Sequence, residues 1–227
     1  EINRRDPEQV HDEIQEGVIA QKINPRVNQD IIIVAIDNYT LKELNNRFIQ
    51  WPFPWDLHAG VTNYLASGKP NSIVFDIMFL ENKPGEERLA DAFKKAGNVI
   101  IDYPFEKVED NARHFDYFDR IKYINQNTLP AHPEDKSTKW VSDIVPPTAK
   151  ILSSVKGAGF ANIRPDSDNK NRSMPMYINH QGLYYPSVDL MIVLSYFDIT
   201  LSDVEIVPGK QVLLKNIKQE KLKKPSK

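Results

Sequence analysis

Three aspartates stand where acidic side chains could cooperate in chemistry. Asp37, Asp76 and Asp102 each follow or interrupt a short apolar run of the kind that forms a buried strand. If these strands are parallel, their carboxyl ends share one edge of the sheet, where α/β folds build ligand and metal sites. Carboxylate oxygens are also the ligands that hard cations prefer. One hypothesis is therefore a metal-dependent hydrolase or phosphoesterase that uses these three acids.

A structural explanation competes with this hypothesis, since acids at strand ends also cap helices or face water. The position of Asp76 favours a functional role. Residues 77–79 continue the apolar run beyond it, which predicts that Asp76 is buried, and a buried carboxylate must be paired or hydrogen-bonded. No general base and no phosphate-binding loop accompanies the acids. The hydrolase hypothesis therefore stays an alternative.

Other patterns of catalysis and metal binding are missing from the sequence. The five histidines have no metal-ligand spacing, and there is no GxSxG, GxxxxGK[ST] or GxGxxG motif. The absence of cysteine excludes thiol catalysis, cysteine-based zinc sites and disulfides. Residues 166–171 begin like a calcium loop, but Lys170 and Asn171 occupy two of its essential positions, which favours a tight turn rich in Asp and Asn. We assign no catalytic residue, metal or cofactor.

The segment 51–55 combines two prolines with three large aromatic residues. The prolines exclude a helix interior, because they remove backbone donors and fix φ. Rigid rings could clamp a ligand, since they give a large contact area at low entropic cost. We favour the alternative, in which this segment closes one end of the core.

The elements that would position these residues alternate between strand and helix. After an amphipathic helix over 7–22, the pattern predicts a buried strand, a helix that Thr40 caps, a helix that Asp56 caps, a second strand, a third helix and a third strand. Their expected ranges are 31–36, 40–48, 56–68, 72–79, 85–96 and 98–102. In the second helix, we expect Leu57, Val61, Tyr64 and Leu65 on the inner face. This order is typical of a βαβαβ unit with a mostly parallel sheet.

The rest of the chain departs from that rhythm. Residues 103–145 show no clean period, which predicts an irregular excursion. A helix after Pro146-Pro147, a strand, a hairpin, an apolar helix, two further strands and a solvated tail follow. Their ranges are 146–157, 158–163, 174–185, 188–197, 204–207 with 211–214, and 215–227. We expect one α/β domain over residues 1–227, with a mostly parallel central sheet flanked by helices and a C-terminal antiparallel portion.

Composition excludes several classes of protein. The chain has 227 residues, with 29 basic and 31 acidic side chains. This balance argues against general nucleic-acid binding, which needs a basic excess. The longest clean apolar run is 31–36, so these residues contain neither a membrane span nor a signal peptide. The first residue is Glu, which suggests a piece of a longer protein.

A series of short motifs occurs in a fixed order along the chain. Residues 31–37 are expected to form a strand that ends in an acid, and 51–59 are similar to a WPWPR-x-x-HA signature. Residues 68–79 are similar to GA-x-x-I-x-FD-x-x-F and lead to a helix and strand at 89–99. Residues 159–172 are similar to a GxxN…D-x-DG-x-x-R turn, and 186–187 to the start of a PS-led helix.

This order resembles that of a known family, the sensory extracellular domain of the second type associated with cyclases and histidine kinases (the CHASE family, second type). Two residues depart from the family pattern. Trp55 replaces an Arg of the signature. Asn169 replaces a Gly, which is a mild change because Asn also tolerates positive φ.

The resemblance implies an extracytoplasmic sensor of a bacterial transmembrane receptor, tethered to the membrane in the intact protein. Its cytoplasmic effector would be a nucleotide cyclase, with adenylate cyclase first, a histidine or other protein kinase, or a phosphatase. The domain itself would not be an enzyme. Its partners would be an unknown small molecule, ion or protein signal and a second copy of the receptor. A dimerisation module without a ligand, using helix 7–22, is a further alternative. We expect Asp37, Trp51, Asp76 and Arg172 to lie near the ligand or to decide the structure.

Overall fold

The computed structural model describes residues 30–106, 116–135, 143–163 and 165–222. The chain divides into two compact units, Glu1–Gln50 and Trp51–Lys227. The expectation of one domain over residues 1–227 therefore stays a prediction. The predicted helix 7–22 lies outside the described residues. Within the described ranges, no helix has the length and apolar character needed to cross a membrane.

The described part of the first unit consists of an extended segment and one helix. Helix α2 (Asn38–Asn46) begins after Asp37, whose carboxylate accepts the backbone N–H of Thr40 at 2.8 Å. The sequence had placed the cap at Thr40 itself. The predicted buried strand 31–36 is wrong: these residues belong to no strand, and Ile32 and Ile33 are 84% and 86% exposed. A strand needs a hydrogen-bonding neighbour, and residues 30–50 supply no second strand for pairing.

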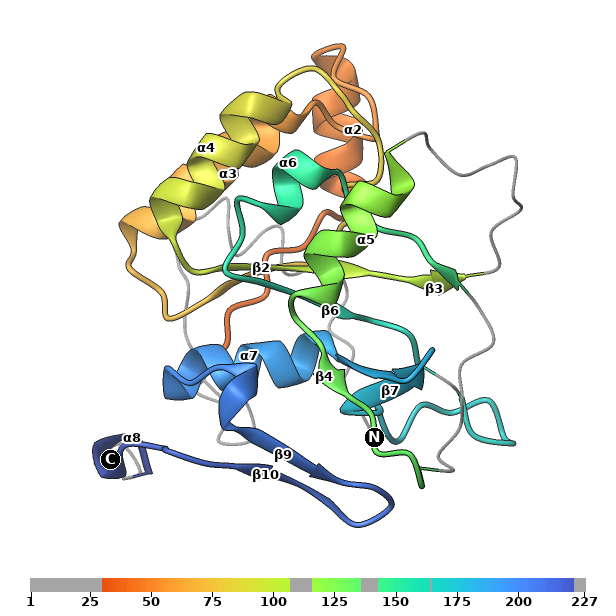
Figure 1. The fold of residues 1–227 in the computed structure, drawn as a ribbon. Coiled ribbons are helices and arrows are strands. Elements are labelled where there is room, and N and C mark those ends of the chain that lie inside the picture. The colour runs from red at the N-terminus through yellow and green to blue at the C-terminus, as the bar shows by residue number, and fades with distance from the viewer. Residues whose placement is uncertain (1–29, 107–115, 136–142, 164, 223–227) are drawn as a thin grey trace. The chain divides into compact units, whose positions relative to one another are not determined.

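The second unit is organised around a parallel sheet in the order β1-β2-β6 (Figure 1). Its strands are β1 (Ile73–Phe75), β2 (Val99–Tyr103) and β6 (Gly157–Phe160). All five residues of β2 are buried, as expected for a central strand covered on both faces. The predicted second strand, 72–79, is shorter than expected because the chain turns away after Phe75. This turn carries Phe79, which is fully buried, into the core.

One face of this sheet is covered by α3 (Trp55–Ser67) and α4 (Glu86–Ala96), which pack against each other. Helix α4 buries Leu89 and Phe93 and ends at Gly97 with φ 70°, as predicted. Helix α3 differs from the prediction. It begins at Trp55, whose ring packs on Phe79 at 5.7 Å.

The early start of α3 changes both its cap and its inner face. Asp56 does not cap the helix but pairs with Arg88 at 3.3 Å. The helix is turned so that Tyr64, predicted to face inward, is 79% exposed. Its buried residues are Trp55, His58, Ala59 and Thr62.

The other face of β2 and β6 packs against α7 (Val188–Phe197), as Figure 1 shows. Ser187 caps this helix by accepting the backbone N–H of Leu190 at 3.1 Å. Strand β6 approaches the start of α7 so closely that a Cβ on Gly159 would lie 2.4 Å from the backbone nitrogen of Val188. A glycine is therefore required at this position.

The remaining elements form short antiparallel pairs and small helices. Strands β3 and β5 form one two-stranded sheet, β9 and β10 form another, and a three-stranded sheet has the order β4-β8-β7. Their bounds are β3 (Phe105–Glu106), β4 (Leu129–Pro130), β5 (Asp143–Ile144), β7 (Tyr177–His180), β8 (Leu183–Pro186), β9 (Val204–Val207) and β10 (Gln211–Leu214). The helices are α5 (Tyr117–Asn125), α6 (Ala149–Leu152), α8 (Gln219–Leu222) and the 3-10 turn η2 (Leu201–Asp203). The mixed α/β class, with a parallel sheet and C-terminal antiparallel strands, is confirmed.

Candidate functional site

Asp76 and Asp102, two of the three predicted acids, come together at the carboxyl ends of β1 and β2. The Asp102 side chain lies within hydrogen-bonding reach of the Asp76 carboxylate, and Asp102 is only 2% exposed. Burial and then the neighbouring Asp76 carboxylate raise the pKa of Asp102 to about 7. The sequence argument expected Asp76 to be the buried acid, which is wrong, because Asp76 follows the end of β1 and is exposed.

The third acid, Asp37, has a local role in the first unit. Its carboxylate accepts both the backbone N–H and the hydroxyl of Thr40, at 2.8 and 2.7 Å. The backbone N–H of Thr40 is the main cause that holds the pKa of Asp37 below its usual value. Among the described residues, no group of three or more His, Asp or Glu side chains is placed to hold a metal ion.

The aromatic segment divides between the core and the surface. Phe53 and Trp55 are buried, which agrees with the expected closure of the core. Trp51 is 51% exposed and rests with its ring edge-on against Phe53, 5.1 Å between centroids. About half of Trp51 is therefore exposed to solvent, while its ring packs against the buried Phe53.

Arg172 organises the polar turn 165–171. Its guanidinium donates two hydrogen bonds to Asp168, at 2.9 and 2.7 Å, and one to Asp166 at 2.8 Å. These bonds hold the pKa of the Asp168 carboxyl below its usual range. Asn169 has φ 59°, in keeping with its replacement of the family's glycine. Arg172 therefore stabilises the turn through its own two acids.

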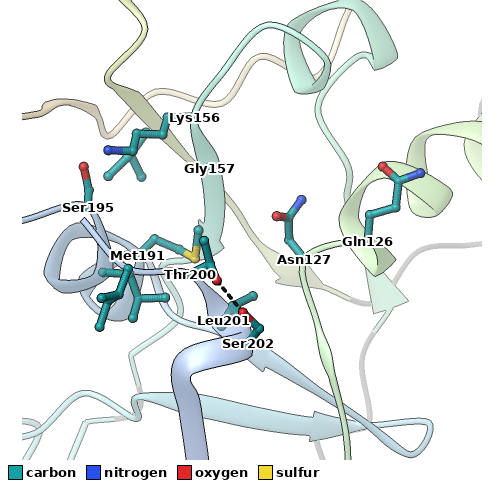
Figure 2. Close-up of a pocket in the computed structure, with 12 residues that line it drawn as sticks. Gln126, Asn127, Lys156, Gly157, Met191, Ser195, Thr200, Leu201 and Ser202 are labelled. Atoms are coloured by element: carbon teal, nitrogen blue, oxygen red, sulfur yellow. Dashed lines mark hydrogen bonds between the residues drawn. The ribbon is translucent and has the colours of Figure 1, made fainter. Parts of the chain in front are cut away.

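A pocket of about 360 Å³ lies on the α7 side of the sheet, with Lys156, Gly157 and Met191 in its wall (Figure 2). It opens where β2 and β6 begin and is bordered by α7, the end of α5 and the loop 199–202. The apolar side chains in its wall are Ile100, Met191, Leu194, Ile199 and Leu201. The polar ones are Gln126, Asn127, Lys156, Ser195, Thr200 and Ser202.

The chemistry of this pocket suits binding rather than catalysis. Of its lining residues, Lys156 alone carries a formal charge. The acid beside a lining hydroxyl is Asp203, which lies outside the wall and accepts the Thr200 hydroxyl at 3.2 Å as part of the cap of η2. The hydroxyls bond to one another, Thr200 with Ser202 at 2.6 Å and Ser195 with Ser72 at 2.9 Å. An apolar wall with a few polar groups is the usual construction of a small-molecule site.

Sequence reasoning missed this pocket. Its polar residues come from four separate segments and form no motif. The one available signal was the apolar character of 188–197, which predicted a helix and not a cavity. The pocket depends on tertiary packing that no local pattern records.

The comparisons with known proteins agree with the order of motifs in the sequence. A family model described as the CHASE2 domain matches residues 8–224, which is nearly the whole chain. No curated protein and no solved structure matches the chain.

Proposed function

The chain belongs to the CHASE2 domain family, whose members are extracellular sensory domains of signalling receptors, and on this premise we propose that it is the signal-input domain of a bacterial transmembrane receptor. The observation that carries this proposal is the extent of the family match, residues 8–224. The family is sensory rather than catalytic, which fits a domain that binds a signal without transforming it. The effector would be a nucleotide cyclase, adenylate cyclase first, or a protein kinase or phosphatase.

The pocket beside α7 is the proposed ligand site. Its volume lies within the range of small-molecule pockets. Lys156 offers a cation, the amides and hydroxyls offer hydrogen bonds, and Met191 and Leu194 offer an apolar wall. These groups suit a small molecule with a polar or anionic end. Such a ligand moves the receptor's output only if it binds two conformations with different affinity.

A thermal-shift screen of small carboxylates, amino acids, sugars and phosphate esters tests this site. We expect a compound that raises the melting temperature of the wild-type domain and of Lys210→Glu, an exposed control in the β9–β10 turn. The same compound should fail on Lys156→Glu, which reverses the pocket's charge, and on Ser202→Trp, which fills its wall. Equal shifts in all four proteins, or no shift in any, would overturn the assignment of the pocket.

The location and the effector are tested on the full-length gene product. Membrane helices on both sides of residues 1–227 and a cyclase, kinase or phosphatase domain would support the receptor. A soluble protein that ends near Lys227 would contradict it. Sedimentation of the domain with and without residues 1–22 tests dimerisation through helix 7–22, and a monomer in both cases would count against that role.

A further inference from the structure

The parallel sheet brings Asp76 and Asp102 together at one edge. Ile100, two residues before Asp102 in β2, packs in the cluster with α7. Alternate residues of a strand share a face, so the Asp102 carboxyl leaves β2 toward the α7 side of the sheet. Asp76 follows Phe75, the last residue of β1, which lies opposite Ile101, and the Asp76 carboxylate contacts the Asp102 side chain from there.

The elements around Asp102 offer no positive side chain. Strands β1, β2 and β6 and helix α7 contain no lysine, arginine or histidine. The residue opposite Asp102 in β6 is Gly159, and the acid on α7, Asp189, is exposed in its first turn. His58 of α3 packs among phenylalanines of the opposite face. The titratable group that acts on Asp102 is another carboxyl group, that of Asp76, one residue beyond the end of β1.

The burial of Asp102 requires a positive species at the pair. Its Oδ1 is buried without a hydrogen-bond partner, and the whole residue is 2% exposed. Two carboxylates in contact do not both ionise at low cost, and a shared proton turns one of them into a donor for the other. A metal ion would need more ligands than this pair, and the described residues contain no group of three acids or histidines to supply them. A shared proton needs only two oxygen atoms, one from each carboxyl group.

We propose that the Asp76–Asp102 pair is a proton-binding site through which the domain responds to the acidity of its surroundings. The proton binding stands on the geometry of the pair, whereas its role as a signal rests on the function proposed above. With the proton bound, the ends of β1 and β2 are joined by a carboxyl–carboxylate hydrogen bond. When the proton leaves, like charges repel at this point, and Asp76 turns to solvent. The exposed position of Asp76 gives the proton its route in and out.

Stability measured against pH tests the pair directly. For an acid with a folded-state pKa of about 7 and an unfolded value near 3.9, the folded state holds the extra proton between these limits. The unfolding constant of the wild type should therefore rise by about 80-fold relative to that of Asp102→Asn between pH 5 and pH 8. The ratio removes the contributions of all other titrating groups, because both proteins share them.

Two variants and one spectroscopic measurement complete the design. Asp76→Asn should show a smaller rise than the wild type, because the charge of its neighbour is gone while burial remains. Asp119→Asn, an exposed control on α5, should follow the wild type. The Cγ chemical shift of Asp102 should titrate with a midpoint near 7.

Three results would overturn the proposal. The first is a parallel pH dependence of the wild type and Asp102→Asn, and the second is a Cγ midpoint below pH 5. The third is stabilisation of the wild type but not of Asp102→Asn by millimolar Mg²⁺ at pH 8, which would identify a divalent cation as the occupant. None of these results bears on the pocket or on the location of the domain, which their own experiments test.

Discussion

The contact between β6 and the first turn of α7 leads to a matched pair of substitutions in one strand. A Cβ on Gly159 would lie 2.4 Å from the nitrogen of Val188 and 2.5 Å from the carbonyl carbon of Ser187. Both neighbours are backbone atoms, which cannot rotate away. A Cβ on Gly157 would meet one atom, the terminal methyl of Met191, at 2.5 Å. That methyl ends a flexible side chain and can move into the pocket.

The expected losses of stability differ because of these neighbours. Gly159→Ala forces β6 and α7 apart, and overpacking of this kind costs about 1–3 kcal/mol. The movement also strains the Ser187 cap of α7, and losing a cap costs about 1 kcal/mol. The lower entropy of the unfolded alanine chain returns about 0.4–1 kcal/mol. We therefore expect Gly159→Ala to lose about 1–4 kcal/mol and Gly157→Ala to stay within about 1 kcal/mol of the wild type.

Urea unfolding of the wild type and the two variants measures the difference. The midpoint for Gly159→Ala should fall clearly, with the slope unchanged, while that of Gly157→Ala should stay near the wild type. Equal stability of the two variants would refute the close approach of β6 to α7. A larger loss for Gly157→Ala would show that Met191 is held rigidly.

Three further predictions concern single side chains. Ser187→Ala removes the cap of α7 and should lower the free energy of unfolding by about 1 kcal/mol in the same urea assay, and an unchanged value would contradict the cap. Asn162 accepts the backbone N–H of Phe105 at 2.7 Å and donates to the carbonyl of Phe105 at 3.0 Å. Asn162→Ala loses both bonds and should lower the free energy of unfolding by about 1–3 kcal/mol. Asn162→Asp keeps the oxygen that accepts the first bond, so it should cost less than Asn162→Ala. Burial first, and then Lys83, lower the pKa of His58, so the folded state holds fewer protons. Stability is therefore lost as the pH falls below the unfolded pKa near 6.5, and His58→Phe should remove this loss. An equal loss of stability in the two proteins on acidification to about pH 5, in the same urea assay, would contradict it.

Local patterns predicted the elements whose signals lie within a few residues. The helix 188–197 and the strands 204–207 and 211–214 have the predicted bounds, because a Ser cap, an apolar run and a Pro-Gly turn are local signals. The run 31–36 failed because strand propensity cannot form a strand without a neighbour to pair with. In helix α3, Leu65 packs against the core as predicted, whereas Tyr64 is exposed. The helix begins with the buried Trp55, and its fully buried positions are His58, Ala59 and Thr62 instead.

The candidate sites divide in the same way. The meeting of Asp76 and Asp102 could be predicted, because the carboxyl ends of adjacent parallel strands share an edge. Which of the two is buried could not, since that depends on where β1 ends. The glycine and asparagine of the motif 159–162 have structural explanations, namely the approach of α7 and the bridge to Phe105. The pocket was beyond local prediction, because α5, β6 and α7 meet there from distant parts of the sequence.

The most direct test of the proposed sensory function is the side of the membrane on which the domain lies. Residues 1–227 contain no cysteine, so Lys210→Cys in the exposed β9–β10 turn introduces a single thiol into the domain. The full-length protein, with any cysteine outside these residues replaced, is expressed in bacterial cells and treated with a membrane-impermeant maleimide. We predict that the Lys210→Cys protein is labelled in intact cells. Labelling that appears only after the cells are lysed would contradict it.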